Sequence, residues 1–251
     1  DELQESTQVW QEAQRRDHRI SYDYLRRNLN VLTDLGLLEN NARMYRLSPS
    51  GIAVKALLSF KPAAFHDVMH YLYYTSWDLT HKAELCFSWT YQTICNLLWD
   101  AKPSSIDAEK LAAELLSIAQ SSFPDEQRIA ISAYAIEGAY HWIRALEPAF
   151  VTLPAQRGKR ETGSGRTTCS PELFMLSIDY LYRKLGLPYQ SPMLLDESKA
   201  RAVCQLCLLD MARFNQVVEL TIRTFSALRM HSGEWGLSLV LAKPIRVEGL
   251  A

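Results

Sequence analysis

Two histidines and an aspartate in "FHDVMHYLYY" have a spacing that could support metal chemistry. His66 and His70 lie four residues apart, which places both imidazoles on one face of a helix, where they could share a metal ion. Asp67 occupies the place of the general base in zinc hydrolases, but its side chain is one methylene shorter than the usual glutamate. No third ligand follows at a recognisable spacing. A metal-dependent enzyme using His66 and His70 therefore ranks last among three hypotheses, and we expect no bound metal.

A second pattern that could bind metal or carry redox chemistry is "CQLC", with Cys204 and Cys207. A structural zinc site needs a second ligand pair, and Cys86 and Cys95 are nine residues apart and do not supply one. The motif also lies in an apolar helical run, "AVCQLCLLDMARF", and free cysteines are among the most buried residue types. We predict that both cysteines pack in the core.

The stretch "GSGRTT" is similar to a phosphate-binding loop, but no lysine follows its second glycine and no strand clearly precedes it. The chain shows no nucleophile elbow or catalytic triad signature. We therefore predict a protein that is not an enzyme and needs no cofactor.

The surrounding segment, residues 154–171, is rich in Gly, Ser, Thr and basic residues and has few apolar side chains. Such a segment cannot offset its ordering entropy by its own packing, so we predict a flexible basic loop. Its cations could contact a nucleic-acid backbone, or the loop could be a plain linker. These cations are Arg157, Lys159, Arg160 and Arg166.

The most informative segment is "SYDYLRRNLNVLTDLGLLENNARMYRLSPSG", residues 21–51. Its leucines recur at helical spacing after Ser21, a plausible N-cap, and Gly36 is placed to end that helix. Two short strands around an Asn40-Asn41 tip are predicted next, and Pro49 and Gly51 mark their end. The polar residues between the leucines would face outward.

This segment resembles the second half of a winged helix-turn-helix of the MarR or ArsR type. The resemblance covers roughly residues 15–60; upstream, "VWQEAQRRDHRI" is more polar than the family's preceding helix. The matching residues are Ser21, Leu29, Leu32, Gly36, Leu37, Tyr45, Leu47, Pro49 and Gly51, with Ser48 where Thr is usual. The resemblance implies a recognition helix in the major groove of duplex DNA and a wing near the backbone. The implied contact residues are Tyr22, Asp23, Arg26, Arg27, Asn30, Arg43 and Arg46.

Composition places these features in an ordinary globular chain. The 251 residues are 48% hydrophobic and 22% charged, and no apolar run reaches the roughly 20 residues that span a bilayer. Five cysteines do not describe a disulfide framework, and no signal-peptide pattern opens the chain, so we expect a cytoplasmic, prokaryotic protein. The net charge of −1 is segregated: residues 15–61 carry nine basic and four acidic groups, whereas residues 62–153 carry five and eleven. A basic module on an acidic body favours a polyanionic partner at one end.

The elements that must position these residues are mainly helical. Beyond Pro62, helices are expected near 63–77, 83–100, 106–120, 125–147, 171–186, 196–208 and 211–228. The stretch "EWGLSLVLAKPI" predicts a short C-terminal strand, pairing with the wing or with another chain. We therefore expect a winged-helix domain at 1–61 and a larger helical domain at 62–251.

Three functions remain open at this stage. The first is a non-catalytic DNA-binding protein, either a regulator or the DNA-contacting subunit of a larger complex. The second is an assembly subunit whose winged helix and aromatic helices bind protein partners without DNA contact. The third is the metal-dependent enzyme. We expect a protein partner or a homodimer, and we expect no association with a membrane.

Overall fold

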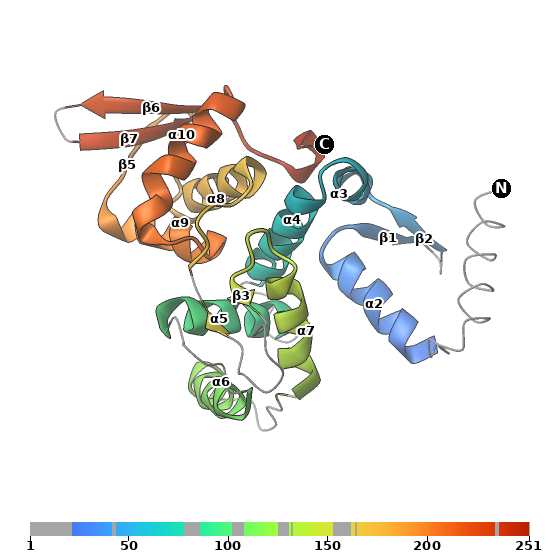
Figure 1. Ribbon diagram of the computed structural model, residues 1–251. Coiled ribbons are helices and arrows are strands. Elements are labelled where there is room, and N and C mark those ends of the chain that lie inside the picture. The colour runs from blue at the N-terminus through green and yellow to red at the C-terminus, as the bar shows by residue number, and fades with distance from the viewer. Residues whose placement is uncertain are drawn as a thin grey trace. The chain divides into compact units, whose positions relative to one another are not determined.

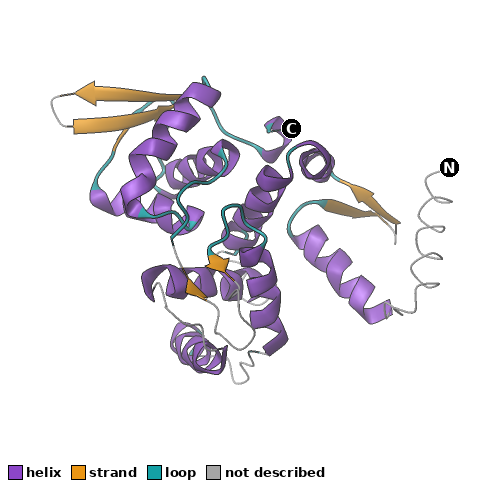
Figure 2. Ribbon diagram, in the orientation of Figure 1, coloured by secondary structure: helices purple, strands orange, loops and turns teal. Residues whose placement is uncertain are grey.

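A computed structural model describes residues 22–41, 44–77, 86–101, 108–124, 131, 133–152, 162–163, 165–233 and 236–250. The chain is mainly helical, with short antiparallel strands, as the sequence predicted (Figure 2). Its contacts divide it into two units, residues 1–52 and 53–251. Helix α3 (Pro49–Phe60), which the predicted boundary after residue 61 assigns to the first domain, straddles this division.

In its described residues the first unit has one helix and one hairpin before α3 (Figure 1). Helix α2 (Tyr22–Asp34) is followed by β1 (Leu38–Asn41) and β2 (Met44–Leu47), which pair antiparallel with Leu38 opposite Leu47. The predicted helix and hairpin are therefore both present. The predicted Asn40-Asn41 tip is wrong by two residues, because both asparagines lie within β1, opposite Tyr45 and Met44. The connecting residues 42–43 lie outside the described residues.

The second unit is built from seven helices in the described part of the chain. They are α4 (Pro62–Thr75), α5 (Cys86–Ala101), α6 (Ala108–Ser122), α7 (Ala133–Arg144), α8 (Pro171–Lys184), α9 (Glu197–Cys207) and α10 (Phe214–Thr224). Helix α4 contacts α5, α7, α8 and α9, and α8 also contacts α9 and α10. Helices α4 and α8 thus form the centre of the unit, and each helix overlaps a predicted range.

Local signals explain where α8 begins and ends. The Ser170 side chain accepts a hydrogen bond from the Leu173 N–H at 3.2 Å, and Pro171 occupies the first turn, where no N–H is needed. Gly186, just past the helix, has φ +63°, a conformation that glycine adopts without steric cost. These are the residues by which the sequence predicted the helix.

The C-terminal strand pairs differently from the prediction. Strand β7 (Gly236–Leu241) lies between β5 (Pro192–Leu194) and β6 (Leu228–Gly233) in a three-stranded antiparallel sheet. The expected pairing with the wing or another chain is therefore wrong, because β5 and β6 of the same unit occupy both edges of β7. Strand β5 follows the loop after α8, and β6 follows α10, which it contacts.

The remaining described elements are one two-stranded hairpin and two short 3₁₀ turns. Strands β3 (Val151–Thr152) and β4 (Thr162–Gly163) pair antiparallel, which brings the two ends of the segment between them together. Two 3₁₀ turns span Met211–Arg213 and Val247–Gly249.

The aromatic residues of α4 and α5 form much of the core of the second unit. Tyr71, Tyr74, Trp89, Tyr91 and Trp99 are all buried. Each remaining aromatic side chain that the structure describes on these two helices is at least half-buried. Tilted and edge-on ring contacts join the two helices to each other and to α7. The predicted aromatic core is confirmed.

No helix in the described part of the chain combines the length and apolar composition that crossing a bilayer requires.

Candidate functional site

The exposed face of α2 carries the polar residues that the sequence singled out. Arg26, Arg27 and Asn30 are exposed, whereas Leu25 and Leu29 are half-buried. Residues three and four apart are neighbours on a helix surface, so Asn30 lies beside both arginines. Two guanidinium groups and one carboxamide thus share a continuous polar face on a helix about 20 Å long.

A serine fixes how the hairpin leaves this helix. The Ser48 hydroxyl donates to the Gly36 carbonyl oxygen at 2.6 Å and accepts from the Gly51 N–H at 3.0 Å, while the Ser48 N–H donates to the Leu37 carbonyl at 3.0 Å. One side chain therefore caps the start of α3 and binds the turn after α2. The sequence identified Ser48 only as standing in place of a threonine, and a threonine hydroxyl could make the same bonds.

Two glycines make this arrangement possible. Gly36 has φ +71°, the left-handed conformation that ends α2. A Cβ on Gly51 would lie 2.1 Å from the Leu37 carbonyl oxygen, well inside van der Waals contact. The helix, turn and hairpin are thus held in one geometry by Gly36, Ser48 and Gly51. All three belong to the motif that suggested a winged helix.

The hairpin presents a mixed surface. Arg46 is exposed on β2, but Glu39 stands directly opposite it in the strand register. The carboxylate reduces the positive charge that Arg46 brings to that face. Met44, Tyr45 and Leu47 are also exposed, with Met44 at 63%. The described part of the hairpin therefore offers apolar area as well as the Arg46 guanidinium.

Several predicted contact residues are not placed by the structure. Tyr22 and Asp23 lie in the first turn of α2, but their side chains are outside the described residues. Arg43 and the predicted loop cations Arg157, Lys159 and Arg160 are also outside them. Their proposed role stays a prediction.

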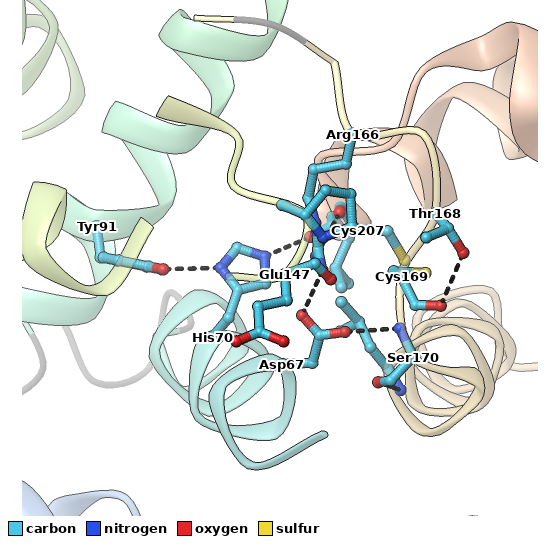
Figure 3. Close-up of polar contacts among 12 residues, drawn as sticks. Asp67, His70, Tyr91, Glu147, Arg166, Thr168, Cys169, Ser170 and Cys207 are labelled. Carbon is cyan, nitrogen blue, oxygen red and sulfur yellow. Dashed lines mark hydrogen bonds and ion pairs between the residues drawn. The ribbon is translucent and has the colours of Figure 1, made fainter. Parts of the chain in front are cut away.

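Arg166 is placed, and its predicted role as a mobile phosphate-binding cation is wrong. The residue is 1% exposed, and its guanidinium nitrogen Nη2 lies 2.8 Å from Asp67 Oδ1 on α4 (Figure 3). Its backbone N–H donates to the Leu208 carbonyl, and its carbonyl accepts from the Asp210 N–H, each at 2.9 Å. The predicted flexibility is therefore wrong at Arg166, because both its side chain and its backbone are held by partners there.

The Arg166 guanidinium also binds three backbone carbonyls. Nε donates to Pro148 at 3.0 Å, Nη2 to Glu147 at 2.8 Å and Nη1 to Cys207 at 3.3 Å. Asp67, in turn, accepts from the Ser170 N–H at 2.7 Å. The buried pair thus connects α4, the turn after α7, the start of α8 and the end of α9. A desolvated ion pair of this kind is tolerated when hydrogen bonds satisfy its remaining donors and acceptors.

His70 lies beside this pair and is fully buried. Its Nε2 is 2.6 Å from the Leu206 carbonyl oxygen, which can only accept, so Nε2 carries the proton. Nδ1, 2.7 Å from the Tyr91 hydroxyl, must then accept from it (Figure 3). Burial lowers the pKa of His70 to about 4, because desolvation disfavours the imidazolium. The neutral ring is therefore the native form, and the lone pair a metal would need is already engaged.

Cys204 and Cys207 are core residues, as predicted. Cys204 and Cys207 are fully buried in α9, and Cys95 is fully buried in α5. The thiols of Cys169 and Cys207 point toward each other next to the Arg166–Asp67 pair (Figure 3). The hydrogen bond with the Cys207 thiol, together with burial, raises the pKa of the Cys169 thiol well above its usual range. Within the described residues no cluster of three His, Cys, Asp or Glu side chains could hold a metal ion.

Sequence reasoning missed the pairing of Asp67 with Arg166. The two residues are about 100 positions apart and come from segments with unrelated patterns, so no spacing could have revealed them. A single clue was present in retrospect: Asp67 lies among apolar residues of α4, where a lone carboxylate would be costly to bury without a partner.

Comparison with protein-family models, with curated proteins and with solved structures found no match to the chain.

Proposed function

We propose that the first unit is a DNA-binding module of the winged-helix kind and that the protein is non-catalytic. In this proposal α2 enters the major groove of duplex DNA and the β1–β2 hairpin lies near the backbone. The supporting observation is the polar face of α2, where Arg26, Arg27 and Asn30 are exposed together on a helix that leads into an antiparallel hairpin.

The chemistry of that face suits a nucleic acid. An arginine can donate two parallel hydrogen bonds to the O6 and N7 of guanine, and an asparagine can pair with the N6 and N7 of adenine. Either guanidinium can instead neutralise a phosphate and release counterions. The major groove, about 12 Å wide, accepts a single helix such as α2.

The loop cations Arg157, Lys159 and Arg160 would add backbone contacts without reading sequence. Replacing these three with Gln is expected to weaken binding about equally for all sequences and to reduce the salt slope by up to about three. Arg166 takes no part, since it is buried in its ion pair with Asp67.

A specific observation favours a second candidate, a protein-docking role for the hairpin. Met44, Tyr45 and Leu47 are exposed on β2, and exposed aromatic and methionine side chains are enriched at protein interfaces. Glu39 opposite Arg46 is also unfavourable near phosphate. In this role the first unit would bind a protein partner and have little affinity for DNA.

One experiment separates the two roles. We expect Arg26→Ala combined with Arg27→Ala to weaken duplex binding by about 30-fold, since losing contacts of this kind costs about 2 kcal/mol. The slope of log affinity against log salt should fall by about two. Fluorescence anisotropy of a labelled duplex, measured at several salt concentrations on the full chain, gives both quantities.

A matched control uses two exposed arginines of the second unit, Arg213→Ala with Arg223→Ala. This variant has the same charge change and should bind DNA like the unaltered protein. Equal losses in both variants would indicate non-specific attraction and would refute the α2 assignment. No measurable DNA affinity in the unaltered chain would favour the protein-docking role.

A further inference from the structure

A small polar cavity of about 190 Å³ lies where α4, α5, α8 and α9 meet in the second unit. Its walls include Tyr74 from α4, Gln92 and Asn96 from α5, Lys184 from α8 and Gln205 from α9. Helix α9 contacts the other three helices, and α4 contacts α5 and α8, so the walls come from packed helices. The cavity is partly open to solvent, and Lys184 and Ala202 of its lining are exposed. Its lining does not include Asp67 or Arg166.

The hydrogen bonds among the lining residues leave some of their polar groups without a partner. The Tyr74 hydroxyl donates to Asn96 Oδ1 at 2.6 Å, so the Asn96 amide nitrogen keeps two N–H groups for another acceptor. Burial raises the pKa of Tyr74, which keeps this hydroxyl protonated. Gln92 Nε2 donates to the Tyr74 carbonyl at 3.2 Å, leaving its own carbonyl oxygen to accept. Among the described residues the Gln205 amide makes no side-chain hydrogen bond.

The charge of the lining is one-sided. Lys184 contributes an ammonium group, and the lining contains no aspartate or glutamate. The Lys184 nitrogen lies 6.0 Å from the centre of the Tyr180 ring, which also lines the cavity. No ion-pair partner of Lys184 is found within the described residues. A cation without a carboxylate, beside amide donors, is suited to an anion.

We infer that this cavity binds a small organic carboxylate, with the carboxylate at Lys184 and a ring or short polar chain among Tyr74, Asn96 and Gln205. An engineered cavity of about 150 Å³ in another protein holds one benzene molecule, so this one has room for a single ring bearing a carboxylate. The carboxamides of Gln92, Asn96 and Gln205 would select a ligand that carries further hydrogen-bonding atoms. This inference does not depend on DNA binding.

A purely structural role for the same residues makes a different prediction. Lys184 lies in the last turn of α8, where a cation stabilises the negative end of the helix dipole. If that were its only role, the cavity would contain water and would not distinguish an anion from a neutral molecule of equal shape.

The test compares nicotinate with nicotinamide, which have nearly the same shape and differ in charge. Titration is followed in the full chain by the side-chain amide signals of Gln92, Asn96 and Gln205 in nitrogen-15 NMR spectra. We expect nicotinate to shift these signals with a Kd on the order of 1 mM, as for other ligands of about nine non-hydrogen atoms. Nicotinamide should bind at least about fivefold more weakly.

Two variants locate the binding. Lys184→Gln should remove the preference for the anion, and Ala202→Trp, at an exposed position lining the cavity, should block both probes. Arg223→Gln, an exposed cation on α10, is the matched control and should bind like the unaltered chain. No shift of the three amide signals at 10-fold the expected Kd would overturn the inference. So would equal affinity for the two probes, or binding that survives Ala202→Trp in a folded protein.

Discussion

Two arginine sites, one in each unit, lie in opposite environments. In the first unit Arg26 and Arg27 are exposed on one face of α2. In the second, Arg166 is 1% exposed and binds a carboxylate and three backbone carbonyls. The sequence around Arg166 is basic and rich in glycine and serine. By composition this segment is more polar than the segment that forms α2.

This difference shows that the charge of a segment does not determine where its cations lie. An exposed arginine contributes little to stability, because its guanidinium interacts with water almost as favourably as with a surface carboxylate. A buried arginine is tolerated only when its partners satisfy it, and it then couples every segment that supplies a partner. The first kind is available to a ligand, and the second is committed to the fold.

The largest expected effect follows from breaking the buried pair. Arg166→Met leaves the Asp67 carboxylate buried without its cation and three carbonyls without their donor, so we expect a loss of about 3–5 kcal/mol. Urea unfolding followed by tryptophan fluorescence measures it, since five of the six tryptophans lie in residues 53–251.

The double variant Asp67→Leu with Arg166→Met removes both charges and should recover part of this loss. A single-variant loss below about 1 kcal/mol would mean that the pair is not coupled to the fold as described.

A slightly smaller effect is expected from pH. His70 has a pKa of about 4 when folded and about 6.5 when unfolded, so between these values the unfolded chain binds a proton that the native chain does not. The neutral His70 therefore stabilises the folded state fully above pH 6.5. As the pH falls toward 4, the free energy of unfolding decreases by about 3 kcal/mol. Unfolding free energies measured from pH 7.5 to 4.5 test this.

His70→Gln supplies the reference, because carboxylates also titrate near the acidic end of this range. The stability of the variant should depend less steeply on pH between 6.5 and 4.5. If the free energy of unfolding changed with pH equally in the two proteins, His70 would not be the group that causes the pH dependence.

The next effect belongs to the first unit. Gly51→Ala places a methyl group 2.1 Å from the Leu37 carbonyl oxygen, and the backbone must shift to accommodate it. We expect a local loss of about 2 kcal/mol, as for other overpacked sites. Amide hydrogen exchange in β1 and β2 should then become about 30-fold faster.

Gly138→Ala is the matched control, since a Cβ there meets no atom within 4 Å in helix α7. It should be neutral or stabilising by up to about 1 kcal/mol. Unchanged exchange in the hairpin of Gly51→Ala would contradict the close packing of the turn.

The smallest effect sharpens the comparison between the two kinds of arginine. Arg26→Ala with Arg27→Ala should change the free energy of unfolding by no more than about 0.5 kcal/mol, because both side chains are exposed. The same protein should lose most of its DNA affinity. A loss of stability near that of Arg166→Met would show that the α2 arginines serve the fold.

Local patterns in the sequence determined most of the secondary structure. Leucines at helical spacing predicted α2, a serine followed by proline predicted the start of α8, and glycines marked where both helices end. These signals concern residues within a few positions of each other, and their physical causes (helical periodicity, capping and backbone freedom) act over the same short distance. For the same reason the outward face of α2 could be predicted from sequence.

The tertiary structure decided what depends on distant partners. Arg166 is buried because Asp67, Glu147 and Cys207, each from a different part of the chain, surround it with acceptors. Strand β7 pairs with β5 and β6 and not with the hairpin, although its own residues would suit either partner. Hydrogen-bond acceptors and strand edges have the same chemistry wherever they occur in a sequence. Only the packing of the helices determines which of them a given donor meets.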